Sequence, residues 1–164
     1  MPELPEVETL CRQLNEVLPG AQIRVVDIID PRLGKVPPLA GKRILSVRRR
    51  GKSILIEMEC GLRAVLHLRM TGRLLWQDVP TALPPYTRMV IGVANARLLL
   101  IDPRRFATFS VRPDDACAAP LGDPLAEFPA HRLRELARKR KLPVKSFLMD
   151  QHLVAGIGNI YACE

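Results

Sequence analysis

Hydrophobic side chains near the start of the chain recur at intervals of three and four residues, the spacing of one face of an amphipathic helix. The positions that share this face are Val7, Leu10, Cys11, Leu14, Val17 and Leu18. Pro5 suits the first turn of a helix, where its missing N–H is no loss. Glu6 and Glu8 lie where the helix dipole favours negative charge. The pattern predicts a helix that begins at Pro5 and is stopped by Pro19-Gly20.

After residue 20 the periodicity changes to short β-branched and alternating runs. In one of them, Ile54, Ile56 and Met58 fall on one face and two glutamates fall on the other. Strands are expected at residues 23–29, 43–47, 53–59, 64–68, 89–93, 97–101 and 106–111, with a hairpin turn at Cys60-Gly61. Many short strands without intervening helices predict an antiparallel sandwich or barrel.

Proline and aspartate become frequent near residue 113, and this composition is typical of a linker. Beyond it, one short helix is expected to end in the basic run Arg138-Lys139-Arg140-Lys141, and a second to extend from Pro143 to about Asp150. Asn159 is suited to cap a third. The expected fold class is α+β. An N-terminal helix with an antiparallel β-sandwich occupies residues 1–112, a linker 113–131 and a helical segment 132–164.

The composition narrows the class of protein. The chain has 164 residues, with 25 Lys+Arg against 17 Asp+Glu, and therefore a formal net charge of +8. A hydrophobic content of 48% supports a core and argues against a disordered chain. No apolar run approaches the roughly 20 residues of a membrane span, and the N-terminus lacks the features of a secretory signal. We expect a soluble, basic, intracellular protein with a polyanionic partner.

The four cysteines, Cys11, Cys60, Cys117 and Cys163, are scattered along the chain. They form no C-x-x-C pair and have no histidine at the spacing of a metal site. A disulfide framework would need a secretory context. We therefore expect reduced, mostly buried thiols, and neither a metal site nor any other cofactor in this chain.

The N-terminus offers a nucleophile. Methionine before a small residue such as Pro2 is normally removed, which leaves a secondary amine. An α-amino group has a pKa of about 7.7–8.0, so part of it is unprotonated near neutrality. Such an amine can attack a sugar C1′ or an aldehyde and form an iminium, with Glu3 and Glu6 placed to move protons. Alternatively, Pro2-Glu3-Leu4-Pro5 is only a conformationally restricted segment that precedes a helix with an acidic first turn.

Two basic segments are candidates for contacts with a polyanion. Arg48-Arg49-Arg50-Gly51-Lys52 is expected between two strands, where its cations suit phosphates; the alternative is a solvated basic loop. In Asp102-Pro103-Arg104-Arg105-Phe106, arginine can bind base edges or phosphates while the phenylalanine wedges between bases. The alternative there is a tight turn followed by a core phenylalanine.

Two shorter segments carry weaker signals. In His67-Leu68-Arg69-Met70-Thr71-Gly72, an exposed Met70 could enter a base stack, although by itself Met70 fits a core position better. In Gly156-Ile157-Gly158-Asn159, backbone amides at a helix start could hold a phosphate, or the segment is simply a helix cap.

Taken together and in this order, these segments closely resemble the formamidopyrimidine-DNA glycosylases, bacterial repair enzymes that remove oxidised purines. The most specific motif is MPELPEVET at the N-terminus. HLRMTG, DPRRF, KSFLMDQ and GIGNIYACE resemble later blocks of the family at matching order and spacing. Endonuclease VIII, a glycosylase for oxidised pyrimidines, also begins with Pro-Glu but continues differently. The resemblance therefore favours the formamidopyrimidine-DNA glycosylases, and an endonuclease VIII-like enzyme is the alternative.

The resemblance implies roles for the residues near the N-terminus. Pro2 would be the nucleophile that attacks C1′ as the damaged base leaves, forming a Schiff base that permits β- and δ-elimination at the abasic site. Glu3 would be the general acid/base at the sugar, with Glu6 supporting it. Lys52 matches a family lysine that contacts the DNA near the lesion.

The resemblance also implies how DNA is held. Met70, Arg104 and Phe106 match residues that fill the gap left by an everted nucleotide. Lys145 and Asn159 match phosphate-binding residues of the family's second domain. The implied partner is damaged double-stranded DNA, and the expected protein is a monomer in the bacterial cytoplasm, associated with the nucleoid.

The sequence departs from the family pattern at several places. Family chains continue past NIYACE, complete a helix–two-turn–helix domain and add a zinc finger with four cysteine ligands. This sequence contains neither the rest of that domain nor the zinc finger, so an incomplete helix–two-turn–helix segment without zinc is expected. Ala107 replaces a usual glycine, and Tyr86-Thr87-Arg88 replaces a segment that usually contains histidine. A catalytically weak or silent DNA-binding remnant, or an unrelated basic binding module, are the competing hypotheses.

Overall fold

A computed structural model describes residues 1–59, 61–78, 81–113, 130–138 and 140–164. The chain begins with helix α1 (Leu4–Val17), which confirms the expected N-terminal helix. Its buried face consists of Leu4, Val7, Cys11 and Leu14, and it packs against strands β2 and β3. Pro19 and Gly20 follow the helix, and Gly20 has a left-handed φ of 82° that a chain reversal needs.

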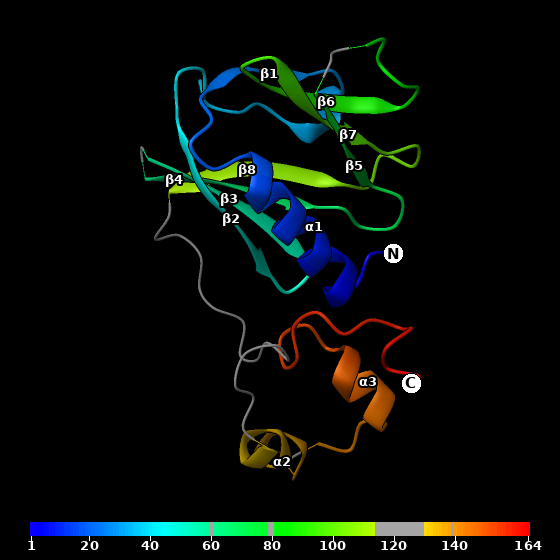
Figure 1. Ribbon diagram of the computed structural model, residues 1–164. Helices are drawn as coiled ribbons and strands as arrows, with labels where there is room; N and C mark the ends of the chain where they lie inside the picture. Colours follow the sequence, from blue (N-terminus) through cyan, green and yellow to red (C-terminus); the bar gives the residue numbers. More distant parts are fainter. Residues whose placement is uncertain (60, 79–80, 114–129, 139) are drawn as a thin grey trace.

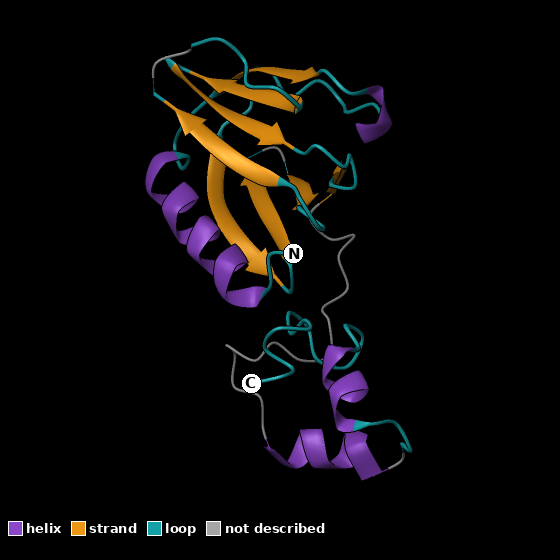
Figure 2. Cartoon of the chain, turned by 90° about the vertical axis from the view of Figure 1, so that its right-hand side faces the viewer, coloured by secondary structure: helices purple, strands orange, loops and turns teal. Residues whose placement is uncertain are grey.

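In the described part of the chain, eight strands form two antiparallel four-stranded sheets, which confirms the expected sandwich (Figure 1 and Figure 2). One sheet has the order β1-β6-β7-β5, and the other has the order β2-β3-β4-β8. The strands are β1 (Ile23–Ile28), β2 (Ile44–Arg50), β3 (Ser53–Met58), β4 (Leu62–His67), β5 (Arg73–Gln77), β6 (Thr87–Val93), β7 (Ala96–Ile101) and β8 (Thr108–Pro113). A short 3₁₀ helix, η1 (Pro31–Leu33), follows β1.

The core lies between the two sheets and extends under α1. It joins side chains such as Ile54 and Leu66 of one sheet to Ile91 and Leu100 of the other, all of them at most 3% exposed. Alternation along β3 and β4 delivers these side chains to one face, because successive residues of a strand point to opposite sides. The sandwich therefore has one continuous core, from whose strands the loops at its ends extend.

The structure departs from the expected strands at several places, three of which bear on the candidate site. Strand β5 was not anticipated, because Leu74-Leu75-Trp76 is a continuous apolar run without alternation; it exists as a strand because it pairs with β7. Strand β2 continues through Arg50, so the first three arginines of the basic segment lie in a strand rather than a loop. Strand β8 begins at Thr108, so Phe106 belongs to the preceding loop.

The later part of the chain is helical, as expected. Helices α2 (Ala130–Arg138) and α3 (Val144–Met149) lie apart from the sandwich (Figure 2). A separate cluster of Phe147, Leu153 and Val154 forms their core, with Leu133 and Leu136 packed against it. Residues 114–129 of the expected linker and Cys60 of the expected turn lie outside the described residues. None of the helices that the structure describes is long and apolar enough to cross a membrane.

Two of the four cysteines fall in the described ranges, and both are free thiols. Cys11 lies on the buried face of α1, and this burial raises the pKa of its thiol to about 12. Cys163 is exposed. Cys60 and Cys117 lie outside the described residues.

We predict that Leu100→Ala lowers the free energy of unfolding by about 2–5 kcal/mol, because it leaves a cavity between the sheets at a fully buried position. Urea unfolding followed by circular dichroism measures this change. Leu75→Ala on the neighbouring strand is the control, since Leu75 is 38% exposed and should cost less than about 1 kcal/mol. Equal effects at the two positions would contradict the sandwich packing.

Candidate active site

The carboxylate of Glu3 joins the first residues of the chain to the last turn that the structure describes. It accepts backbone N–H bonds from Gly158 (2.7 Å), Ile160 (2.9 Å) and Tyr161 (3.3 Å). The next residue strengthens this contact, because the Leu4 N–H donates to the Gly156 carbonyl at 3.1 Å. Glu3 is only 2% exposed. The N-terminus is thus held between the sandwich and the helical segment (Figure 1).

This environment keeps the buried carboxylate charged. Burial alone would raise the pKa of Glu3, but the three backbone donors and the nearby Lys52 ammonium together hold it below its usual value. Lys52 is 8% exposed. Its burial lowers the pKa of its ammonium, and the charge of Glu3 partly opposes that shift. The Glu3 carboxylate and the Lys52 ammonium therefore each favour the charged form of the other, next to the N-terminus.

Lys52 is positioned by the tight turn between β2 and β3. Gly51 has a left-handed φ of 57°. A Cβ at Gly51 would stand 3.4 Å from the Cβ of Ala155, so the turn lies directly against the segment that leads to Gly158. Three segments distant in sequence therefore meet at one place: the N-terminus, the β2–β3 turn and residues 155–161.

Pro2 and Glu6 complete this cluster. Pro2 is half-buried and immediately precedes the fixed Glu3. The Glu3 N–H donates to Oε2 of Glu6 at 2.9 Å, and the Tyr161 hydroxyl lies 3.4 Å from Oε1 of Glu6. The structure therefore brings all four sequence-predicted residues of this site into one region. Tyr161 was missed, since its role depends on a backbone N–H that the sequence does not reveal.

Met70, Arg104 and Phe106 are exposed on two neighbouring loops. Met70 is 47% and Phe106 49% exposed, so the alternatives of a core methionine and a core phenylalanine are wrong. The Arg104 guanidinium stacks 4.7 Å from the centre of the Phe106 ring. The two loops are joined by a hydrogen bond from the Thr71 hydroxyl to Asp102.

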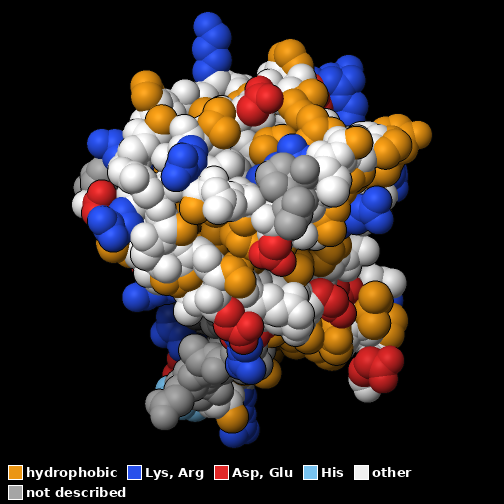
Figure 3. Space-filling view, turned by 45° about the horizontal axis from the view of Figure 1, so that its top comes forward, with side chains coloured by type: hydrophobic (Ala, Val, Ile, Leu, Met, Phe, Trp, Pro, Cys, Tyr) orange, Lys and Arg blue, Asp and Glu red, His pale blue; other side chains and the backbone are white. Residues whose placement is uncertain are grey.

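The basic segment that ends in Lys52 is not a cluster of free cations. Arg48 lies 3.3 Å from a carboxylate oxygen of Glu57, and Arg49 lies 2.8 Å from one of Glu8. Lys52 is buried rather than part of a basic surface. Figure 3 shows Lys and Arg side chains spread around the visible outline, so the positive charge is not confined to one patch of that face.

Within Gly156–Asn159, the Gly158 N–H donates to the Glu3 carboxylate and the Gly156 N–H donates to Oε1 of Gln151 at 2.9 Å. The other two donors to Glu3, Ile160 and Tyr161, lie just beyond this segment. The expected third helix is a single turn, closed by the Ala162 N–H on the Gly158 carbonyl at 3.0 Å. Asn159 itself is exposed at this turn. Lys145 is exposed on α3, with its Nζ 3.0 Å from Sγ of Cys163. Both predicted phosphate-binding side chains are therefore accessible.

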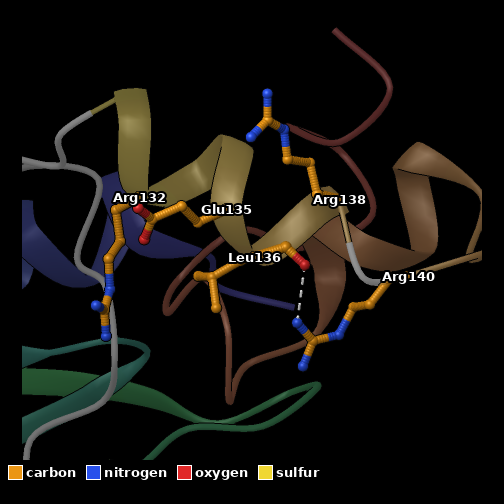
Figure 4. Close-up of a pocket in the computed structure, with 5 residues that line it drawn as sticks. All are labelled: Arg132, Glu135, Leu136, Arg138 and Arg140. Carbon is orange, nitrogen blue, oxygen red and sulfur yellow. Dashed lines mark hydrogen bonds between the residues drawn. The ribbon is translucent and has the colours of Figure 1, made fainter.

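Arg140, in the basic run at the end of α2, caps the C-terminal end of that helix. Arg140 donates from Nη1 to the Leu136 carbonyl at 3.0 Å (Figure 4). Together with Arg132, Glu135 and Arg138, these residues line an open hollow of about 470 Å³. The hollow lies away from Glu3, on the helical segment.

Comparison with known proteins places this architecture among DNA glycosylases of solved structure. The Lactococcus lactis formamidopyrimidine DNA glycosylase, bound to DNA with an abasic site, superposes with a TM-score of 0.89 at 31% identity, over 97% of this chain and 66% of that one. The same enzyme bound to DNA with an oxidised pyrimidine gives a TM-score of 0.91 at 32% identity, over 98% and 65%.

The sequence comparison then specifies the family. The formamidopyrimidine-DNA glycosylase N-terminal domain matches residues 1–109, and the chain belongs to this family. Similar proteins are the formamidopyrimidine-DNA glycosylases of Pelotomaculum thermopropionicum, 39% identical, and Thermus thermophilus, 43% identical. The alignments cover all of this chain, which spans 65% and 62% of the length of these two relatives.

We predict that Gly158→Ala detaches the helical segment from the N-terminus. The new Cβ would stand 2.7 Å from Oε2 of Glu3 and closer still to its Cδ, so the carboxylate must move. The loss of its bonds should cost about 2–4 kcal/mol. Amide hydrogen exchange at Ile160 and Tyr161 measures the change. The control is Gly61→Ala, which meets no atom within 4 Å and adds only left-handed backbone strain. Unchanged exchange in the Gly158 variant would refute the anchor.

The ionised Glu3 also predicts a pH dependence. Because the pKa of Glu3 is lower in the folded state than in the unfolded chain, its contribution is present above about pH 4.5 and is lost as the pH falls through the folded pKa. Compared with Glu3→Gln, the native chain should be about 2 kcal/mol more stable at pH 7, and this difference should shrink below pH 4.5. Urea unfolding of both proteins between pH 3 and 7 tests it. The same difference at pH 3 as at pH 7 would show that the charge contributes nothing.

Proposed function

We propose that this chain acts in DNA base-excision repair as a bifunctional DNA glycosylase and abasic-site lyase whose nucleophile is the N-terminal proline. The observation that carries the proposal is the fixed, charged Glu3 directly behind Pro2, with Lys52 buried beside it. A lowered pKa keeps Glu3 ionised, so that its charge can stabilise positive charge that develops at a sugar carbon. The family membership supports oxidised purines, such as 8-oxoguanine and formamidopyrimidines, as the excised bases.

The family membership and the grouping of Pro2, Glu3, Glu6 and Lys52 support the following reaction. After removal of Met1, the Pro2 nitrogen forms a bond to C1′ while the bond from C1′ to the damaged base breaks, and the base leaves with a proton. Ring opening gives an iminium that acidifies the neighbouring C–H bonds, so that elimination of the 3′ and then the 5′ phosphate cuts the strand. Ionised Glu3 stabilises positive charge at the sugar and accepts a proton, while Glu6 and Lys52 support it.

DNA binding is assigned to the exposed residues. Met70, Arg104 and Phe106 would fill the space that an everted nucleotide leaves, and eversion costs a few kcal/mol of lost stacking. Lys145 and Asn159 would contact phosphates on the helical segment. The proposed partner is damaged double-stranded DNA, bound by a monomer in the bacterial nucleoid. Residues 1–112 would form the catalytic unit, 113–131 the linker and 132–164 a DNA-binding segment.

Oxidised pyrimidines are the second candidate substrate. One structure of the Lactococcus lactis relative contains DNA with an oxidised pyrimidine. Assays on duplexes with 8-oxoguanine and with an oxidised pyrimidine distinguish the two classes. Binding without excision of either would support a DNA-binding role alone.

We predict that borohydride traps a covalent complex between the chain and DNA with an abasic site, because it reduces the iminium to a stable amine. Pro2→Gly retains a primary amine and should trap less efficiently, whereas an extra residue before Pro2 should abolish trapping and leave DNA binding intact. Denaturing gel electrophoresis measures the complex. Glu57→Gln, on the outer face of β3, is the control and should trap normally. Absence of an adduct at every protein concentration would overturn the proposed mechanism.

A further inference from the structure

A second group of buried charges lies apart from Glu3 and Lys52 and has no part in the proposed chemistry. Arg88 of β6 donates from Nε to Asp30 at 2.7 Å, and its Nη1 lies 3.3 Å from Asp102. Arg105 makes two hydrogen bonds to the same Asp30 carboxylate, one of them 2.9 Å from Nε. The side chains of Asp30, Arg88 and Asp102 are 7%, 3% and 0% exposed.

Every oxygen of the Asp102 carboxylate has a partner in one of two loops. Oδ1 accepts the Thr71 hydroxyl and, at 3.2 Å, the Arg104 N–H. Oδ2 accepts the Ala107 N–H at 2.7 Å. Arg88 also donates to the Ala107 carbonyl at 2.8 Å. A buried ion pair is favourable only when such additional hydrogen bonds satisfy its remaining atoms.

The topology explains why these two loops are neighbours. Residues 68–72 lead from β4 in one sheet to β5 in the other, and residues 102–107 lead back from β7 to β8. Strand β4 pairs with β8, and β5 pairs with β7. The two connections therefore begin and end next to each other, at the pairs His67–Thr108 and Arg73–Ile101. We call them the Met70 loop (68–72) and the Phe106 loop (102–107).

Both loops contain a residue in a costly backbone conformation next to the side chain that they expose. Arg69, before Met70, has a φ of 55°, and Arg105, before Phe106, has a φ of 59°. Left-handed conformations of non-glycine residues cost of order 1–3 kcal/mol and persist only where surrounding contacts impose them. The two bonds from Arg105 to Asp30 are such a contact in the Phe106 loop.

We propose that Asp30, Arg88, Asp102 and the Thr71 hydroxyl form a brace that holds the Met70 and Phe106 loops in one relative position, so that both enter damaged DNA as a unit. They are positioning residues, because none of them needs to touch the DNA. The inference rests on the proposed DNA-binding function. Side chains that open a base stack must resist its restoring force, and a loop free to yield would move instead of the bases.

Thr71→Val tests the brace with the smallest change, since it removes the hydroxyl that connects the loops and keeps the shape of the side chain. The dissociation constant of the 164-residue chain for a duplex with a tetrahydrofuran abasic-site analogue should rise about tenfold, which corresponds to about 1.4 kcal/mol. Affinity for undamaged duplex should not change. Thr71→Ser should restore binding. Glu57→Gln, which removes a partly buried charge on β3 away from both loops, is the control and should leave binding to both duplexes unchanged.

A double-mutant cycle separates positioning from a general loss of stability. In a Met70→Ala background the loop has no wedge to position, so Thr71→Val should weaken binding to the damaged duplex no further. An equal, additive loss in that background would overturn the proposal. Asp30→Asn should also weaken binding to damaged DNA. If this variant fails to fold, the Thr71→Val measurements still test the brace.

Hydrogen exchange in the free protein distinguishes failure of the brace from failure of the proposed function. The Ala107 amide, bonded to Asp102, and the Gly72 amide, bonded to the Leu68 carbonyl at 3.0 Å, report on the two loops. Thr71→Val should accelerate exchange at both, and Glu57→Gln at neither. If the native chain shows no preference for damaged duplex, the proposed function fails, and accelerated exchange still supports the brace. Unchanged exchange at both amides would refute the brace itself.

Discussion

The burial of the Glu3 carboxylate is the constraint on which the rest of the site depends. A buried carboxylate is unfavourable unless several donors satisfy its oxygens. Here three donors come from one turn at Gly158, Ile160 and Tyr161, at the far end of the described chain. The free-energy cost of burying the carboxylate is therefore offset only when that turn is formed and its N–H groups contact Glu3. The charge of Glu3 and the attachment of the helical segment are two aspects of one interaction.

This coupling fixes an end of the chain that would otherwise be mobile. Chain termini are usually poorly ordered unless they are tied down. Glu3 is both the residue that precedes α1 and the anion of the docked turn, so the position directly after Pro2 is held by the sandwich and by the helical segment together. The β2–β3 turn adds Lys52 to the same place. In the proposed reaction, an amine held in one orientation would lose less conformational freedom when it attacks a sugar carbon.

The sequence predicted what local periodicity determines and missed what distant partners determine. Helix α1 and seven of the strands follow from patterns within a few residues. Strand β5 does not, since Leu74-Leu75-Trp76 becomes a strand only through its pairing with β7. Arg48 and Arg49 looked like free cations because their partners, Glu57 and Glu8, are remote in sequence. Phosphate binding by the Gly156–Asn159 amides stays a prediction, and the bond from the Gly158 N–H to Glu3 was missed because the two residues are 155 positions apart.

The distribution of buried charge shows what the two polar clusters contribute. The buried charged residues in the described part of the chain are Glu3, Asp30, Lys52, Arg88 and Asp102. Each belongs either to the anchor at the N-terminus or to the brace between the loops; the sandwich core itself is apolar. Buried ion pairs add little net stability, and apolar residues of similar size often serve as well. Their concentration beside the N-terminus and beside the exposed Met70 and Phe106 loops is therefore poorly explained by stability. It is explained by geometry, because hydrogen-bonded charges fix orientation where apolar packing would accept several arrangements.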